Sequence, residues 1–123
     1  MKKKILLVED DKFISEIYFR KFSESGFDIK LAQDGVEAVE LFDEFKPDIV
    51  LLDIMLPKKN GWEVLAELKD KKEKEEFKII MLTNLGEKEK IQEALENGAD
   101  DYIVKASLIP SELVELVKDK LDF

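Results

Sequence analysis

Residues 48–61 read Asp48-Ile-Val-Leu-Leu-Asp53-Ile-Met-Leu-Pro57-Lys-Lys-Asn-Gly61, in which an unbroken apolar run stops at a carboxylate. The run at residues 49–52 is continuous rather than alternating, which is typical of a strand buried on both faces. Such strands belong to parallel sheets that are covered by helices on each side. A carboxylate directly after the strand then lies at the edge where α/β proteins bind their ligands.

Four further apolar runs resemble this one, and with residues 48–52 they give five predicted strands, at residues 5–8, 27–32, 48–52, 77–82 and 102–104. Apolar residues with helical spacing follow each run, at about residues 13–22, 36–42, 62–68, 91–95 and 113–121. This alternation predicts an α/β fold, a doubly wound five-stranded parallel sheet of (βα)5 type with helices on both faces. No linker or repeat divides the chain, so residues 1–123 are predicted to form a single domain.

The first predicted helix has the clearest apolar stripe. Phe13, Ile14, Ile17, Tyr18 and Phe22 recur at intervals of three and four residues. Core packing is the ordinary interpretation of Phe13, Ile14 and Ile17, and we expect it for Ile17.

The composition excludes several kinds of chemistry. The chain has no cysteine and no histidine, so it has no disulfide, no thiol nucleophile and no histidine acid or base, and any metal must be a hard cation bound by oxygen. Its 29 acidic and 20 basic residues give a net charge of −9, which argues against direct binding of nucleic acid. No apolar run approaches the roughly 18 residues of a membrane span. We therefore expect a cytoplasmic protein with no membrane partner.

Polar side chains follow four of the predicted strands, where each strand ends: Glu9, Asp10, Asp53, Thr83 and Lys105. Because the carboxyl ends of parallel strands meet at one edge of a sheet, we expect these side chains to lie close together. The three carboxylates would repel one another, and a divalent cation would relieve that repulsion. Mg²⁺ prefers such oxygen ligands. The sequence therefore predicts Mg²⁺ as cofactor, bound directly by Asp10 and Asp53, with Glu9 acting through a water.

A metal, a lysine and a hydroxyl around one carboxylate make a site for phosphoryl transfer. Asp53 would attack phosphorus, while Mg²⁺, Lys105 and Thr83 stabilise the phosphoryl oxygens. Each residue alone has an ordinary explanation, such as a helix cap, a surface charge or the β propensity of threonine. Their joint occurrence is more specific, and Thr83 is the only threonine in the chain. The predicted product is an aspartyl phosphate on Asp53.

Four stretches carry a resemblance to a known family: ILLVEDD at residues 5–11, VLLDIMLPKKNG at 50–61, MLTN at 81–84 and GADDYIVK at 98–105. With the Asp-x-x-x-Pro-x-x-x-Gly spacing from Asp53 to Gly61, the chain resembles, from end to end, a receiver domain of bacterial two-component response regulators. The resemblance implies the strand order 2-1-3-4-5. It also implies that a histidine kinase, a phosphotransfer protein or a small acyl phosphate phosphorylates Asp53 with Mg²⁺.

The resemblance implies further roles. The main-chain carbonyl of Met55 would be a metal ligand, and Thr83 with Tyr102 would form the switch. The face built from the fourth helix, fifth strand and fifth helix, at about residues 87–121, would change on phosphorylation and bind a target or a second copy of the chain. Such a protein is a signalling switch rather than a metabolic enzyme, although it assists phosphoryl transfer to its own aspartate and hydrolysis from it.

Three positions depart from the family pattern. Glu9 stands where many members have aspartate, which still permits contact with the metal through water. Asn84 is larger than the small residue that usually follows the threonine, so it could obstruct the path of Tyr102. Ala106 replaces a proline whose bond to the preceding lysine is commonly cis, which leaves the shape of this loop open.

Three alternative functions also remain open on the sequence alone. A phosphorylation-independent interaction module could have the same fold. A flavodoxin-like cofactor binder would need a glycine- and hydroxyl-rich phosphate loop after the first strand, where Glu9, Asp10 and Asp11 would instead repel phosphate. An aspartate-nucleophile phosphatase would need a second acid two residues after Asp53, where Met55 stands.

Overall fold

The computed structural model describes residues 2–84 and 88–122. Along the chain its elements are β1 (Lys4–Val8), α1 (Lys12–Glu24), β2 (Asp28–Ala32), α2 (Gly35–Phe45), β3 (Ile49–Leu52), α3 (Gly61–Lys71), β4 (Lys78–Thr83), α4 (Lys88–Glu96), β5 (Asp101–Val104), the short 3-10 helix η1 (Lys105–Ser107) and α5 (Pro110–Lys120). Within these described ranges, no helix is long and apolar enough to cross a membrane.

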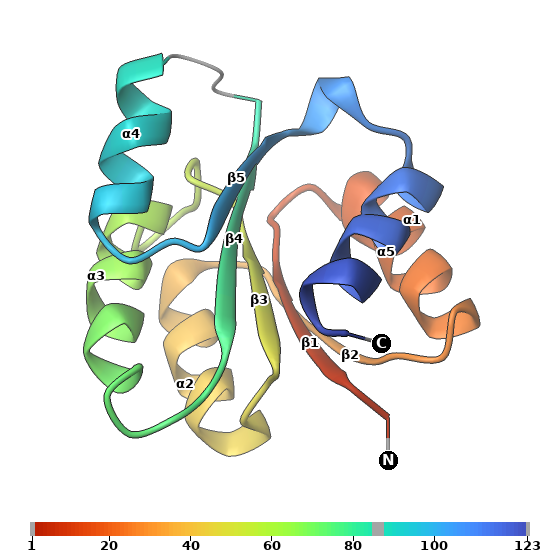
Figure 1. Ribbon diagram of the computed structural model, residues 1–123, viewed down its shortest axis with the longest axis horizontal. Helices are drawn as coiled ribbons and strands as arrows, with labels where there is room; N and C mark the ends of the chain where they lie inside the picture. The colour runs from red at the N-terminus through yellow and green to blue at the C-terminus, as the bar shows by residue number, and fades with distance from the viewer. Residues whose placement is uncertain (1, 85–87, 123) are drawn as a thin grey trace.

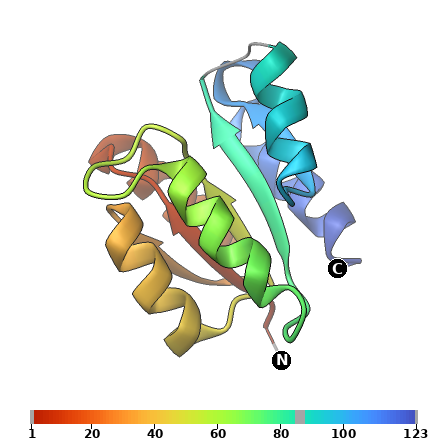
Figure 2. The same cartoon turned by 90° about the vertical axis from the view of Figure 1, so that its left-hand side faces the viewer.

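The strands form one parallel sheet in the order β2-β1-β3-β4-β5. Figures 1 and 2 show α1 and α5 on one face of this sheet and α2, α3 and α4 on the other. The predicted doubly wound α/β fold and the strand order are therefore confirmed.

Side chains of the central strands alternate between two cores. In β3, Val50 and Leu52 belong to the core under α2, α3 and α4, whereas Ile49 and Leu51 belong to the core under α1 and α5. All four are fully buried. Burial on both faces explains why this strand reads as a continuous apolar run in the sequence.

Polar caps start the helices next to the carboxyl edge of the sheet. The side chain of Asp11 accepts a hydrogen bond from Ile14 N at 3.1 Å, which caps α1. Asn60 caps α3 by accepting from Glu63 N at 3.0 Å, and Asn60 N in turn donates to the Glu63 carboxylate at 3.2 Å. The first cap fixes the start of α1 directly after Glu9 and Asp10. The second fixes the start of α3 at the end of the loop that begins with Asp53.

The buried face of α1 differs from the expectation. Tyr18 and Phe22 are buried, but Phe13 is 73% exposed and Ile17 is 41% exposed, so the expectation that Ile17 packs in the core is wrong. Ile14, Tyr18 and Phe22 are four residues apart and form one line along the helix. Phe13 and Ile17 belong to a second line, rotated by about 100° around the helix axis. Only the first line faces the sheet.

The connection from β5 to α5 forms a compact turn. The Lys105–Ala106 peptide bond is trans, and the 3-10 helix η1 begins at Lys105. Ser107 Oγ donates to the carbonyl of Val104 at 2.7 Å, and Leu108 N donates to the carbonyl of Lys105 at 3.3 Å. These bonds keep Lys105 at the end of β5, although no proline follows it.

Candidate functional site

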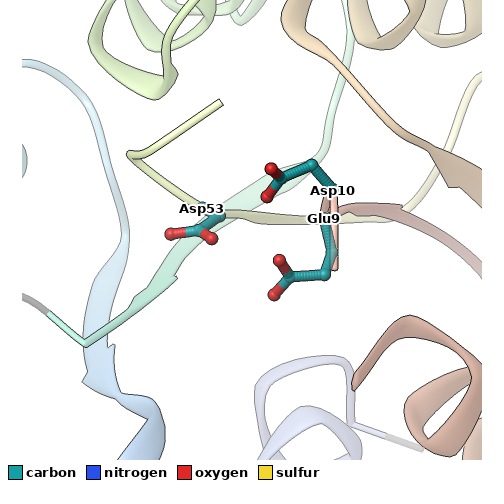
Figure 3. Close-up of side chains that lie close together, drawn as sticks. All are labelled: Glu9, Asp10 and Asp53. Carbon is teal, nitrogen blue, oxygen red and sulfur yellow. The ribbon is translucent and has the colours of Figure 1, made fainter. Parts of the chain in front are cut away.

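Three carboxylates meet at the carboxyl ends of β1 and β3. Glu9 and Asp10 follow β1, and Asp53 follows β3. One oxygen from each carboxylate lies within 4.8 Å of the others, and Figure 3 shows the three side chains gathered at this edge. Glu9 and Asp53 are buried, whereas Asp10 is exposed. Like charges this close together repel one another, and a cation beside them would relieve that repulsion.

Main-chain hydrogen bonds extend the sheet up to two of these carboxylates. Glu9 N donates to the carbonyl of Ala32 at 3.0 Å, and Asp53 N donates to the carbonyl of Val8 at 3.2 Å. Asp53 Oδ1 also accepts a hydrogen bond from Ile54 N at 2.7 Å. The backbone of both acids is therefore held by neighbouring strands, and the Asp53 side chain is held in one orientation.

Lys105 provides a cation beside these acids. Its Nζ donates to Asp53 Oδ2 at 3.0 Å and also to Glu9 Oε1. The Lys105 side chain is only 9% exposed, so water screens these contacts little. The position of Lys105 after the last strand predicts its place near Asp53, but its bond to Glu9 is not evident from the sequence.

Burial and ion pairing have opposite effects on two pKa values in this cluster. Burial raises the pKa of the Glu9 carboxyl and outweighs the hydrogen bond and charge of Lys105, which lower it. For Lys105, burial lowers the pKa, but the hydrogen bonds and negative charges of Glu9 and Asp53 together outweigh burial, so its pKa is raised. Lys105 therefore stays protonated at physiological pH.

The groups at this edge fit a Mg²⁺ ion. With the three carboxylates ionised and Lys105 protonated, the cluster keeps two negative charges, which a divalent cation would neutralise. The carbonyl of Ile54 accepts hydrogen bonds from Leu56 N and Gly61 N, at 3.0 and 2.8 Å. The neighbouring carbonyl of Met55 accepts none within residues 2–84 and 88–122, so it is available as an oxygen ligand.

Thr83 and Tyr102 lie on the next two strands of the sheet. Thr83 ends β4 and is 1% exposed. It pairs in register with Val104, the residue before Lys105, so the hydroxyl residue and the lysine lie at neighbouring strand ends. Tyr102 is partly buried and packs against the core under α2, α3 and α4.

The start of α2 makes a contact with the neighbouring loop that the sequence does not indicate. Asp34 and Gly35, where β2 leads into α2, contact the loop that joins β3 to α3. Gly35 N donates to the carbonyl of Pro57 at 3.4 Å, and Asp34 forms an ion pair with Lys58 at 3.5 Å. An Asp-Gly pair is common in turns, so the sequence gives no sign of this contact. The structure shows it, because the loop leaves no room for a side chain at Gly35.

Comparison with known proteins agrees with this geometry. The family model described as response regulator receiver domain matches residues 5–118. The chemotaxis protein CheY of Halobacterium salinarum is 39% identical over 126 residues, which cover 98% of each chain. A CheY-like receiver domain protein from Methanospirillum hungatei has a TM-score of 0.90 at 30% identity, covering 99% of this chain and 95% of that one. The CheX-CheY-BeF3-Mg²⁺ complex from Borrelia burgdorferi contains a chain with a TM-score of 0.87 at 30% identity, covering 97% of this chain and 89% of that one.

The match extends over nearly the whole chain and includes every strand of the sheet. The acids after β1 and β3 and the lysine after β5 stand at the sheet edge where a doubly wound fold binds its ligands. The chain belongs to the family of response regulator receiver domains.

Proposed function

We propose that this receiver domain accepts a phosphoryl group on Asp53, from a histidine kinase, a phosphotransfer protein or a small acyl phosphate, with Mg²⁺ as cofactor. The observation that carries the proposal is the setting of Asp53. Its side chain is buried, bonded to Lys105, and has an oxygen within 4.8 Å of oxygens of Glu9 and Asp10. Receiver domains are signalling switches, so the transfer changes the state of the protein rather than turning over a metabolite.

The transfer replaces one bond to phosphorus by another. A carboxylate oxygen of Asp53 attacks phosphorus, and the bond from phosphorus to the donor histidine nitrogen breaks, its electron pair leaving on that nitrogen. Ile54 N holds Oδ1 and Lys105 Nζ holds Oδ2, so the carboxylate is oriented before the donor arrives. Lys105 then neutralises charge on the phosphoryl oxygens, and the hydroxyl of Thr83 donates a hydrogen bond to one of them. Bound Mg²⁺ would supply further positive charge, held by the carboxylates of Asp10 and Asp53, the Met55 carbonyl and, through a water, Glu9.

Two of the alternatives do not survive. Membership of the receiver family argues against a flavodoxin-like cofactor binder and an aspartate-nucleophile phosphatase. We favour phosphorylation over a phosphorylation-independent module, because Lys105 is bonded to Asp53 and Thr83 ends the strand beside the one that carries Lys105. The CheY of Borrelia burgdorferi, solved with BeF3 and Mg²⁺ in complex with CheX, supports a metal-dependent site and a protein partner here.

Labelling with acetyl phosphate tests the proposed function. In the presence of Mg²⁺ the protein should gain the mass of one phosphoryl group, measured by intact mass spectrometry. EDTA added before the donor should suppress this gain, because the acidic cluster then lacks its cation. Equal labelling with and without EDTA would contradict the metal assignment, and no labelling in either case would contradict the acceptor role.

We propose Thr83 and Tyr102 as the switch that reads this phosphoryl group. Thr83 would move toward the group, and the ring of Tyr102, already partly buried, would follow. Among its described residues, α4 has a single buried side chain, Ala94, so this helix is lightly anchored. The surface formed by α4, β5 and α5 can therefore rearrange and bind a target or a second copy of the chain. This face was expected to begin at Glu87, which lies outside the described residues.

Tyr102→Ala should uncouple phosphorylation from this rearrangement. We expect acetyl phosphate labelling to persist, because the acceptor and Lys105 are unchanged, while the phosphorylation-dependent change in amide exchange over α4 and β5 is lost. Tyr102→Phe keeps the ring and is the matched control, with exchange expected to respond as in the wild type. A wild-type response in Tyr102→Ala would show that this side chain is not the switch.

A further inference from the structure

The loop from β3 to α3 is pressed against the start of α2. Gly35 is the first residue of α2, and its N donates to the carbonyl of Pro57 at 3.4 Å. A Cβ atom added to Gly35 would lie 1.8 Å from the carbonyl oxygen of Lys59 and 2.6 Å from its carbonyl carbon. The φ of Gly35 is outside the left-handed region, so lack of space rather than backbone conformation requires glycine here. Any other residue must push this loop away.

Asp34 links the same two segments through its side chain. Its Oδ1 accepts from Glu37 N at 2.8 Å, as the cap of α2, and its Oδ2 lies 3.5 Å from Lys58 Nζ. Lys58 has φ 66°, a left-handed conformation that residues other than glycine rarely adopt. The Lys58 side chain is 68% exposed, so water screens this ion pair. The loop is therefore held by a close steric contact at Gly35 and a weaker ionic contact at Asp34.

Hydrogen bonds inside the loop close the chain around Met55. The carbonyl of Ile54 accepts from both Leu56 N and Gly61 N, at 3.0 and 2.8 Å, which closes the loop into a tight turn. A Cβ atom on Gly61 would lie 2.2 Å from the carbonyl oxygen of Asp53, so the start of α3 also lies directly against it. A tight turn enclosed on both sides moves as a unit. We expect a shift of its α2-facing side to displace Met55, which lies only two residues before Pro57.

We propose that Gly35, supported by Asp34, is a positioning residue for the magnesium site. The contact between α2 and the loop sets where the Met55 carbonyl stands relative to the carboxylates of Asp10 and Asp53. This inference rests on the proposed function, since it assumes that these three groups bind the metal. Mg²⁺ requires near-ideal octahedral geometry, whereas Ca²⁺ accepts variable ligand numbers and distances. A displaced Met55 carbonyl should thus weaken Mg²⁺ binding more than Ca²⁺ binding.

Gly35→Ala tests this proposal through the selectivity between the two ions. Isothermal titration calorimetry with Mg²⁺ and, separately, with Ca²⁺ gives both dissociation constants for the wild type and the variant. We expect Mg²⁺ to bind about tenfold more weakly, as is typical when a residue that orients metal ligands is changed. Ca²⁺ binding should weaken clearly less, so the preference for Mg²⁺ falls. A simple loss of folded protein would lower the number of sites for both ions and leave the ratio of dissociation constants unchanged.

Ala38→Gly is the matched control for damage to α2. Ala38 is a buried residue of the same helix in the core under α2, α3 and α4, and glycine at this position weakens the helix without adding an atom beside the loop. This variant should keep the wild-type ratio of the Mg²⁺ and Ca²⁺ dissociation constants.

Asp34→Asn is the second test variant, for use if Gly35→Ala does not fold. It keeps the cap of α2 but removes the charge that pairs with Lys58. We expect it to lower the preference for Mg²⁺ over Ca²⁺ about twofold.

The outcomes separate this inference from the proposed function. Wild-type dissociation constants for both ions in folded Gly35→Ala would overturn the positioning role. If Gly35→Ala cannot be folded, a wild-type ratio of the Mg²⁺ and Ca²⁺ dissociation constants in Asp34→Asn would also overturn the positioning role. Absence of Mg²⁺ binding by the wild-type protein would overturn the metal site itself and the positioning role with it.

Discussion

Replacing Asp53 with asparagine should abolish labelling of the protein by acetyl phosphate at saturating Mg²⁺. An amide lacks the nucleophilic oxygen of a carboxylate, so labelling should fall to the background of the assay. Asparagine has nearly the same size, and its oxygen can still accept the 2.7 Å hydrogen bond from Ile54 N, so the fold should remain intact. The measurement is the intact mass after a fixed time of incubation.

Asp11→Asn is the matched control for the loss of charge. Asp11 is exposed at the same edge of the sheet, and it caps α1 by accepting from Ile14 N at 3.1 Å. Asparagine caps helices as well as aspartate does, so this variant removes one negative charge but neither the acceptor nor a proposed ligand. We expect it to be labelled like the wild type. Labelling that persists in Asp53→Asn would show that another residue accepts the phosphoryl group.

Addition of Mg²⁺ should raise the melting temperature, and Asp10→Asn should remove most of the rise. Glu9, Asp10 and Asp53 repel one another, and a cation that binds only the folded chain stabilises it. At a Mg²⁺ concentration ten times the dissociation constant, the free energy of unfolding should increase by about 1.4 kcal/mol, or roughly 4–8 °C for a domain of this size. Scanning calorimetry across a Mg²⁺ titration measures both effects.

The same control variant distinguishes ligation from general screening of charge. Asp11→Asn has the same net charge as Asp10→Asn but should retain the stabilisation by Mg²⁺. KCl at matched ionic strength should not reproduce the rise, because it screens charges without binding between them. An equal rise in Asp10→Asn and the wild type would contradict the assignment of Asp10 as a direct ligand, and no rise in the wild type would count against the whole metal site.

The strands could be predicted because burial on both faces leaves a continuous apolar run, as at residues 49–52. Their order could not be obtained from such runs, since a strand sequence does not name its neighbours, and it came from the family resemblance. Apolar spacing also failed to separate the two lines of side chains on α1. Phe13 and Ile17 recur with helical periodicity just as Tyr18 and Phe22 do, but the sheet covers only one of the two lines.

The candidate site was predictable to the extent that strand ends determine it. Glu9, Asp53 and Lys105 meet because parallel strands end at one edge, which the order of the residues along the chain already indicates. The bond from Lys105 to Glu9 depends on side-chain conformations that spacing does not specify. The approach of Gly35 to Lys59 depends on how a helix packs against a loop, and an Asp-Gly pair gives no sign of it.

Mapping the phosphoryl group to a single residue tests most directly whether Asp53 is the acceptor. The protein is treated with acetyl phosphate and Mg²⁺ and then reduced with borohydride, which converts an aspartyl phosphate to homoserine, before proteolysis and peptide mass spectrometry. We expect homoserine at position 53 alone, and none in a sample treated with EDTA. Homoserine at any other aspartate, with Asp53 unmodified, would contradict the assignment of Asp53 as the acceptor.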